Sequence, residues 1–282
     1  MDALRLTPET QKKFQQLASA AENKTNKQDV YLKLPPVLSR EGYHFIIPAF
    51  FELLLHLQKQ GRDFAIVFRT FGSDIPEVAA ELNLFCTGQH PCYPHARFDG
   101  TNGTMDLRLH FPQSTAVLHR SDSLISIISG THIAVKNVPS APLPKDISII
   151  QVPISKEKSS SSTLSPVLDF IVKNAFPESS LRRSFSLGDC YQYWAQHLEH
   201  SSAGKLLVVN NNDNDSSQVE QIFLDDNIEE DDAHIVDVRY ESGEIVPFAQ
   251  ALNKYIFRVD PLAAIFDSQY FIRALQVCKS SM

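Results

Sequence analysis

Apolar positions alternate between a helical and a strand-like spacing in the first half of the chain. Residues 49–60 form an amphipathic helical pattern that ends at Gly61. Residues 63–69 (DFAIVFR) are a nearly continuous apolar run, which is typical of a strand buried on both faces of a parallel sheet. A second helix is expected after Ser73 or Asp74, because either side chain can cap its first turn. This succession of elements predicts an α/β fold.

The middle of the chain has a different pattern. Between Tyr93 and about Pro153, short alternating apolar runs are separated by glycine and proline, which predicts hairpins. These runs are MDLRLHF, TAVLHR, SLISIIS and HIAVKNV. Residues 155–165 (SKEKSSSSTLS) are expected to form a loop. The segment LRRSFS is also expected to be a loop, in which Arg183 stands three residues before Ser186 in a weak kinase-type pattern.

The last third returns to strands and helices. A helix over CYQYWAQHLEH carries Tyr191, Tyr193 and Trp194, and we expect these aromatic side chains to lie in the core. Strand-like runs follow it, in the order KLLVVN, QIFLDD, HIVDVR and YIFRVD. The run LAAIFDSQYFIRALQVC is expected to be one final helix.

The domain organisation follows from these patterns. Residues 1–34 are polar and are predicted to form a helix, from Pro8 to Ala21, and a linker. Residues 35–282 are predicted to form one α/β domain with a Rossmann-like core and a parallel sheet. A β-rich insertion at about 90–155 is expected to interrupt that core.

Composition excludes several classes of protein. The 282 residues are 43% hydrophobic and include 18 Phe and 8 Tyr, which is too apolar for a disordered chain. Lys and Arg number 26 against 33 Asp and Glu, and the net charge of −7 argues against binding nucleic acid or anionic membrane through bulk charge. Four cysteines are too few for a disulfide framework. The apolar run from His44 to Leu57 is too short to span a bilayer, and the first residues lack a signal core. We therefore expect a cytoplasmic protein with neither a nucleic-acid nor a membrane partner.

Two adjacent carboxylates are the sharpest chemical signal. Asp225 and Asp226 end an apolar strand, and ligands of open α/β sheets bind at the carboxyl ends of strands. Mg²⁺ commonly takes one or two protein carboxylates together with phosphate and water. The alternative is a solvated turn after a strand. Asp225 and Asp226 are thus the candidate magnesium ligands.

Other polar side chains could share that site. Thr70 ends the strand 63–69, with Ser73 close behind, and a hydroxyl near a helix N-terminus can bind phosphate. Lys205 enters the strand-like run KLLVVN and could present a cation at the same place. Taken separately, Thr70 could be an ordinary turn hydroxyl and Lys205 a surface lysine. Thr70, Ser73 and Lys205 are the candidate phosphate-binding residues.

In the order Thr70, Lys205, Asp225-Asp226, these residues resemble three of the four motifs of the haloacid dehalogenase-like (HAD-like) phosphohydrolases. The segments RTFGSDI, FCTGQHPCYP, AGKLL, IFLDDNI and IVDVR resemble an uncharacterised eukaryotic group of that superfamily, over roughly residues 35–280. The resemblance implies a HAD-type core, in which Thr70 and Lys205 bind the transferring phosphoryl group of a phosphorylated small molecule. It also implies that the acidic pair helps to hold Mg²⁺.

The nucleophile motif of that superfamily is missing. The resemblance requires an Asp in a D-x-D or D-x-N segment at the end of a strand that precedes Thr70. Before Asp63, the chain has only Asp2 and Asp29, and neither ends an apolar strand. Asp63 itself opens the strand that leads to Thr70. Acyl-phosphate chemistry therefore has no nucleophile here.

The segment FCTGQHPCYPH raises the possibility of zinc. It holds Cys86, His90, Cys92 and His95, all of them zinc-ligand residue types, but their spacing matches no common finger or ribbon. The alternative, which we favour, is a rigid loop that packs aromatic side chains beside the ligand-binding end of the sheet. These side chains are those of Phe85 and Tyr93.

Three functional hypotheses remain from the sequence. The first is a non-catalytic, binding or regulatory HAD-like protein that keeps a phosphate and Mg²⁺ pocket. The second is a Mg²⁺-dependent phosphatase whose nucleophile strand comes from a longer product of the gene or from a partner chain. The third is a zinc-stabilised interaction module, which depends on residues 86–95 alone.

Overall fold

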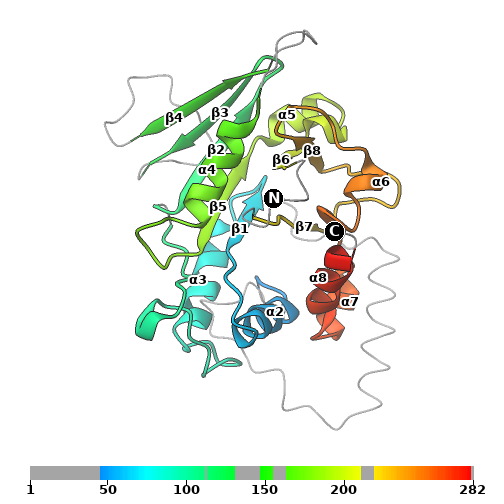
Figure 1. The fold of residues 1–282 in the computed structure, drawn as a ribbon. Helices are drawn as coiled ribbons and strands as arrows, with labels where there is room; N and C mark the ends of the chain where they lie inside the picture. Colours follow the sequence, from blue (N-terminus) through cyan, green and yellow to red (C-terminus); the bar gives the residue numbers. More distant parts are fainter. Residues whose placement is uncertain (1–44, 112, 131–146, 155–162, 211–218, 281–282) are drawn as a thin grey trace.

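A five-stranded sheet with the strand order β1-β5-β2-β3-β4 is the largest β structure in the chain (Figure 1). The structure is a computed structural model, and it describes residues 45–111, 113–130, 147–154, 163–210 and 219–280. The predicted helix and linker of residues 1–34 lie outside these ranges, as do the run HIAVKNV and most of the predicted loop at 155–165. No helix among the described residues combines the length and the apolar composition needed to cross a bilayer.

The sheet is mixed, whereas the sequence predicted a parallel one. Three strands run parallel to each other, namely β1 (Ile66–Thr70), β5 (Ser184–Asp189) and β2 (Thr115–Arg120). Antiparallel pairing then adds β3 (Leu124–Ser129) and β4 (Ser148–Pro153). The α/β class is confirmed by the alternation of these strands with helices.

The predicted β-rich insertion does not stand apart from the core in the described residues. Strand β2 lies in the middle of the sheet and pairs with β5, so residues 115–120 belong to the same sheet as β1. The run MDLRLHF is not a strand. Within it, Asp106 makes only isolated bridges, to Asp99 and Arg182, among the residues that the structure describes.

Strand β5 corrects the prediction of a loop at LRRSFS. All six of its residues are buried, and Ser186 is fully inaccessible. Its hydroxyls are satisfied from distant segments, because Ser184 Oγ donates to the carbonyl of Arg108 at 2.7 Å and Ser186 Oγ lies 2.7 Å from Thr115 Oγ1. A buried serine in a central strand is not a kinase target in the folded chain.

Three helices pack against the sheet, two of them in a shared apolar cluster and the third in another. The predicted helices are α2 (Pro48–Lys59), which ends before Gly61 at φ +66°, and α3 (Ile75–Cys86), which follows Asp74. They share one apolar cluster around Phe51, Leu82 and Phe85. Helix α4 (Ser165–Ala175), which was not predicted, packs its apolar side on β5 and β6 in another cluster.

The C-terminal part forms two small parallel sheets (Figure 1). One pairs β6 (Lys205–Val209) with β8 (Val236–Tyr240), and the other pairs β7 (Phe223–Asp225) with β9 (Ile256–Arg258). α5 (Tyr191–Gln196) and the 3₁₀ turn Ser201–Ala203 connect β5 to β6, and α6 (Phe248–Ala251) connects β8 to β9. The predicted final helix is two helices, α7 (Pro261–Phe266) and α8 (Tyr270–Ser280). They separate at Asp267, whose side chain accepts from the backbone N–H of Gln269.

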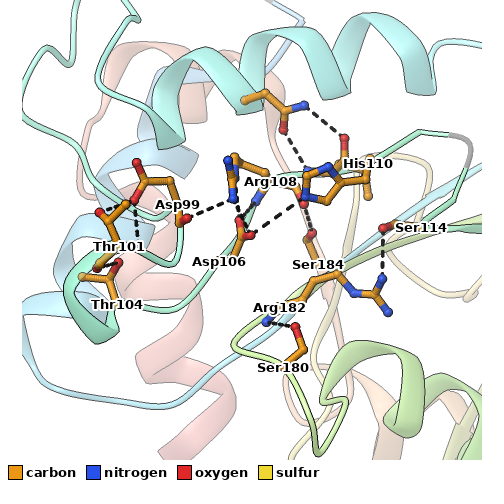
Figure 2. A network of polar contacts seen from close by, with 12 residues as sticks. Asp99, Thr101, Thr104, Asp106, Arg108, His110, Ser114, Ser180, Arg182 and Ser184 are labelled. Carbon is orange, nitrogen blue, oxygen red and sulfur yellow. Dashed lines mark hydrogen bonds and ion pairs between the residues drawn. The ribbon is translucent and has the colours of Figure 1, made fainter.

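A polar network ties the connection between α3 and β2 to the amino end of β5 (Figure 2). Arg108 donates from Nε and Nη2 to the Asp106 carboxylate at 2.9 and 2.8 Å, and its Nη2 also donates to the carbonyl of Asp99. Arg182 Nη1 donates to Ser114 Oγ at 3.4 Å. These contacts lie at the end of the sheet opposite to the carboxyl ends of β1 and β5.

Candidate functional site

An ion pair joins two of the residues predicted from strand ends. Lys205, the first residue of β6, donates from Nζ to Oδ2 of Asp225, the last residue of β7, at 2.9 Å. The two side chains are 7% and 10% exposed, so solvent screens the attraction weakly. The ammonium also lies over two aromatic rings, 5.2 Å from the ring centre of Phe71 and 5.7 Å from that of Phe223. The structure therefore brings Lys205 and Asp225 together.

Two buried guanidinium groups hold the backbone on either side of Lys205. Arg69 of β1 donates from Nη1 to the carbonyl of Leu206 at 2.6 Å. Arg120, at the end of β2, donates from Nη1 to the carbonyl of Gly204 at 2.7 Å. Each side chain is 5% exposed. The five-stranded sheet thus fixes the position of Lys205 through both flanking residues.

Each of these arginines is neutralised by a buried aspartate. Arg69 donates from Nε and Nη2 to the two carboxylate oxygens of Asp189, the last residue of β5. Arg120 donates from Nη2 to Asp237 Oδ2 at 2.7 Å, and Arg239 donates from Nε to the same oxygen at 2.8 Å. Paired in this way, the cations can remain charged in the interior.

Thr70 is the last residue of β1 and lies in a tight polar turn. Its Oγ1 accepts from the backbone N–H of Gly72 at 2.8 Å and donates to Asp74 Oδ1 at 2.8 Å. Phe71, whose ring contacts the Lys205 ammonium, follows it directly. Ser73 is half-buried in the turn that leads into α3. The carboxyl end of β1 therefore adjoins the Lys205–Asp225 pair.

The two adjacent aspartates differ in their electrostatics. Burial opposes the charge of Asp225, but the Lys205 ammonium and hydrogen bonds from Asn227 outweigh it and lower the pKa of that carboxyl. Partial burial of Asp226, together with the negative charge of Asp225, raises the pKa of Asp226 above its ordinary value. A cation bound next to Asp226 would lower the pKa of that carboxyl again, because a nearby positive charge stabilises the ionised form.

Asp225 and Asp226 would give a bound Mg²⁺ few protein ligands. Asp225 already accepts from Lys205 on Oδ2 and from both nitrogens of Asn227 on Oδ1, which occupies about three of its roughly four acceptor positions. Asp226 accepts from Asn227 Nδ2 at 3.1 Å and lies at the surface, where it can still bind an ion. No group of three His, Cys, Asp or Glu side chains is placed to share a metal within the described ranges. The pair would hold Mg²⁺ mainly through Asp226, with phosphate and water as the other ligands.

Arg69 and Asp189 were missed from the sequence. Arg69 ends the apolar run of residues 63–69, where a single charged residue is not by itself a site signal. Asp189 ends the segment SFSLGD, of which only the first three residues fall in the loop predicted at LRRSFS. The available signal was that SFSLGD alternates polar and apolar positions and, like QIFLDD, ends in an aspartate, as a strand with a site residue at its carboxyl end would.

The four candidate zinc ligands of residues 86–95 lie in different surroundings. Cys86 is buried in the core, where burial and the charge of Asp106 hold its pKa far above the ordinary value. The His90 ring is buried beside Glu81, with Nε2 3.4 Å from Oε1, and its Nδ1 accepts from the backbone N–H of Cys92. Cys92 and His95 are exposed. This arrangement does not favour the zinc-stabilised module.

The segment instead packs aromatic rings, as the alternative interpretation expected. The ring centres of Phe85 and Tyr93 are 5.3 Å apart, and both rings contact Phe51 of α2. Its expected position was wrong, however. The backbone N–H of Phe98 donates to Cys86 and that of Asp106 donates to Leu181, so the segment lies toward the amino end of β5.

Comparison of the chain with protein-family models, with curated proteins and with solved structures finds no match in any of the three.

Proposed function

We propose that the chain is a HAD-like protein that binds a phosphorylated small molecule with Mg²⁺ and lacks the nucleophilic aspartate, so that it acts in binding or regulation. The observation that carries the proposal is the 2.9 Å contact of Lys205 with Asp225, next to the carboxyl end of β1. In this proposal the ends of β1, β6 and β7 supply a hydroxyl, an ammonium and two carboxylates to one site. These are the groups that neutralise and orient a phosphoryl group and its metal.

Binding should be weak for a physical reason. Asp225 already neutralises the Lys205 ammonium, so a phosphate dianion gains less from that cation than it would from an unpaired lysine. Thr70 must also turn its hydroxyl from Asp74 toward the ligand. Mg²⁺ held by Asp226 would supply the remaining positive charge.

The test is a calorimetric titration of the full chain with inorganic phosphate, with and without Mg²⁺. We expect Mg²⁺-dependent binding that falls about 10- to 100-fold in Thr70→Val, the loss of one hydrogen bond to a charged group. Asp226→Asn should abolish the Mg²⁺ dependence. Asp231→Asn is the matched control, because Asp231 is also exposed and lies in the same acidic segment. Equal phosphate affinity of the parent chain and the three variants would contradict the proposal.

A second candidate is favoured by the arrangement of β1 and β7. Within the described residues, β1 pairs with β5 alone and β7 with β9 alone. Two contacts nevertheless relate the strands, because Arg62, before β1, lies 3.8 Å from Glu220, before β7, and the guanidinium of Arg69, near the end of β1, lies 5.8 Å from the ring centre of Phe223, the first residue of β7. They therefore run side by side in the same direction, bridged by long side chains.

A further strand inserted between β1 and β7 would find backbone partners on both sides. If it ended in an aspartate, that carboxylate would lie near Thr70 and Lys205. This supports the hypothesis of a Mg²⁺-dependent phosphatase completed by a longer product of the gene or by a partner chain. The discriminating assay is hydrolysis of an aryl phosphate by the 282-residue chain, alone and with a peptide that carries an apolar strand ending in D-x-D.

The first candidate predicts no turnover in either mixture. Turnover that needs the peptide and Mg²⁺, and that is lost in Asp225→Asn, would establish the second candidate. Turnover by the chain alone that is lost in both Asp225→Asn and Asp226→Asn would contradict the absence of a nucleophile.

A further inference from the structure

Aromatic rings lead from the buried ammonium to the surface. The Phe71 ring, 5.2 Å from Lys205 Nζ, stacks on Trp194 with the ring centres 5.2 Å apart and the planes 18° apart. It meets Tyr191 edge to face at 5.8 Å. Trp194 is 6% exposed, whereas Tyr191 is 48% exposed. We call Phe71, Tyr191 and Trp194 the aromatic patch.

The exposure of Tyr191 departs from the sequence prediction of a core residue. Tyr191 is the first residue of α5 and follows Asp189, which the Arg69 guanidinium holds at the end of β5. Trp194 is fixed behind Phe71, because its Nε1 donates to the carbonyl of His234 at 3.2 Å. An exposed ring on a rigid backing can take part in stacking at little cost in conformational entropy.

The position of the aromatic patch relates it to the phosphate pocket. Phe71 follows Thr70 at the carboxyl end of β1, and Tyr191 stands two residues after Asp189, the last residue of β5. The aromatic patch therefore lies beside the proposed phosphate site at this end of the sheet. Because Asp225 neutralises Lys205, the phosphate group alone would bind weakly, and the part of the ligand beyond the phosphate would decide selectivity. The surface available to that part is aromatic.

We propose that the ligand of this site is a phosphomonoester of an aromatic ring, with the phosphate toward Thr70 and Lys205 and the ring against the exposed side of Tyr191. This inference rests on the proposed phosphate pocket and narrows its ligand class. An aromatic pair is worth about a 2- to 12-fold difference in affinity beyond simple burial. Aryl phosphates should therefore bind more tightly than alkyl phosphates by that factor or more.

The chain reports on this patch directly, because Trp194 is its single tryptophan and stacks on Phe71. The experiment titrates the full chain, with Mg²⁺, with phenyl phosphate, ethyl phosphate and phenol, and follows tryptophan fluorescence. Calorimetry with the same three compounds gives a readout that does not depend on the tryptophan. We expect phenyl phosphate to bind about 2- to 12-fold more tightly than ethyl phosphate, and phenol to bind least.

Substitutions then locate the selectivity. Tyr191→Ala should remove most of the preference for phenyl phosphate and leave the affinity for ethyl phosphate unchanged. Phe266→Ala is the matched control, since Phe266 is a 50% exposed aromatic residue on another element, α7, and its loss should change neither affinity. Thermal unfolding of both variants checks that each remains folded.

The outcomes separate this inference from the proposal beneath it. Equal affinity for phenyl and ethyl phosphate would overturn the aromatic ligand class and leave the phosphate pocket standing. Phenol binding as tightly as phenyl phosphate would also overturn it, because the ring site would then be independent of the phosphate. Binding of none of the three compounds would overturn both.

Discussion

Replacing Asp189 with alanine would remove one partner of the buried ion pair that joins β1, β5 and β6. The Arg69 and Asp189 side chains are 5% and 3% exposed, and the guanidinium donates to both carboxylate oxygens and to the Leu206 carbonyl. Without the carboxylate, a charged guanidinium stays buried with only the carbonyl among these acceptors. Breaking a buried pair in this way costs about 3–5 kcal/mol, so we expect Asp189→Ala to lower the free energy of unfolding by that amount.

The chain offers a matched control at the other end of the same two strands. Asp63, just before β1, accepts from Arg183 Nε at 2.9 Å and from Nη2 at 3.3 Å, but the Asp63 side chain is 63% exposed. Asp63→Ala makes the same chemical change in water-exposed surroundings, where such a pair contributes about 0–1 kcal/mol. The double variant Arg69→Met/Asp189→Leu should be more stable than Asp189→Ala, because it leaves no buried charge.

Urea unfolding, followed by both circular dichroism and Trp194 fluorescence, measures all three variants. Their m-values should agree with that of the parent chain if the folded state is retained. If Asp189→Ala and Asp63→Ala differ in their free energy of unfolding by less than about 1 kcal/mol, the argument from burial is wrong.

Two further predictions concern pH and backbone packing. Burial lowers the pKa of His119, so this residue takes up a proton at a higher pH in the unfolded chain than in the folded chain. The free energy of unfolding should therefore fall as the pH drops below about 6.5, with a slope of at most about 1.4 kcal/mol per pH unit, and His119→Gln should reduce that slope in urea unfolding at several pH values. A Cβ on Gly204 would lie 2.4 Å from the carbonyl oxygen of Ile235, so Gly204→Ala should displace β6 from β8. We expect it to lower the free energy of unfolding in urea by about 1–3 kcal/mol. An unchanged unfolding midpoint would show that the backbone shifts there without cost.

Local signals were sufficient to predict the first α/β unit. Helices α2 and α3 carry their own boundaries, since Gly61 adopts φ +66° after α2 and Asp74 precedes α3. Strand β1 is a continuous apolar run that needs no partner to be recognised. The strand ends at Lys205 and Asp225 could also be located, because a charged residue bordering an apolar run is a local feature.

The central strand β5 could not be predicted in the same way. Its serines look like loop residues, and they become acceptable in a buried strand only through hydroxyl contacts with residues about seventy positions away, such as Ser186 with Thr115. The Arg69–Asp189 pair joins residues 120 positions apart, so no window of the sequence contains both charges. Tyr191 was assigned to the core from its helical neighbours, but α5 is only six residues long and begins at the surface.

The same long-range contacts determine how site variants should be interpreted. Arg69 and Arg120 hold the carbonyls of Leu206 and Gly204, on either side of Lys205, yet the guanidinium groups face buried aspartates and are not expected to touch a ligand. Substituting either arginine should weaken phosphate binding in proportion to the loss of stability, because Lys205 moves with its backbone. Substituting Thr70 or Asp226, the proposed ligand contacts that solvent can reach, should weaken binding while the unfolding midpoint stays near that of the parent chain. The phosphate affinity of the variants at Arg69, Arg120, Thr70 and Asp226 can be plotted against their free energy of unfolding. This plot separates groups that contact the ligand from groups that position Lys205.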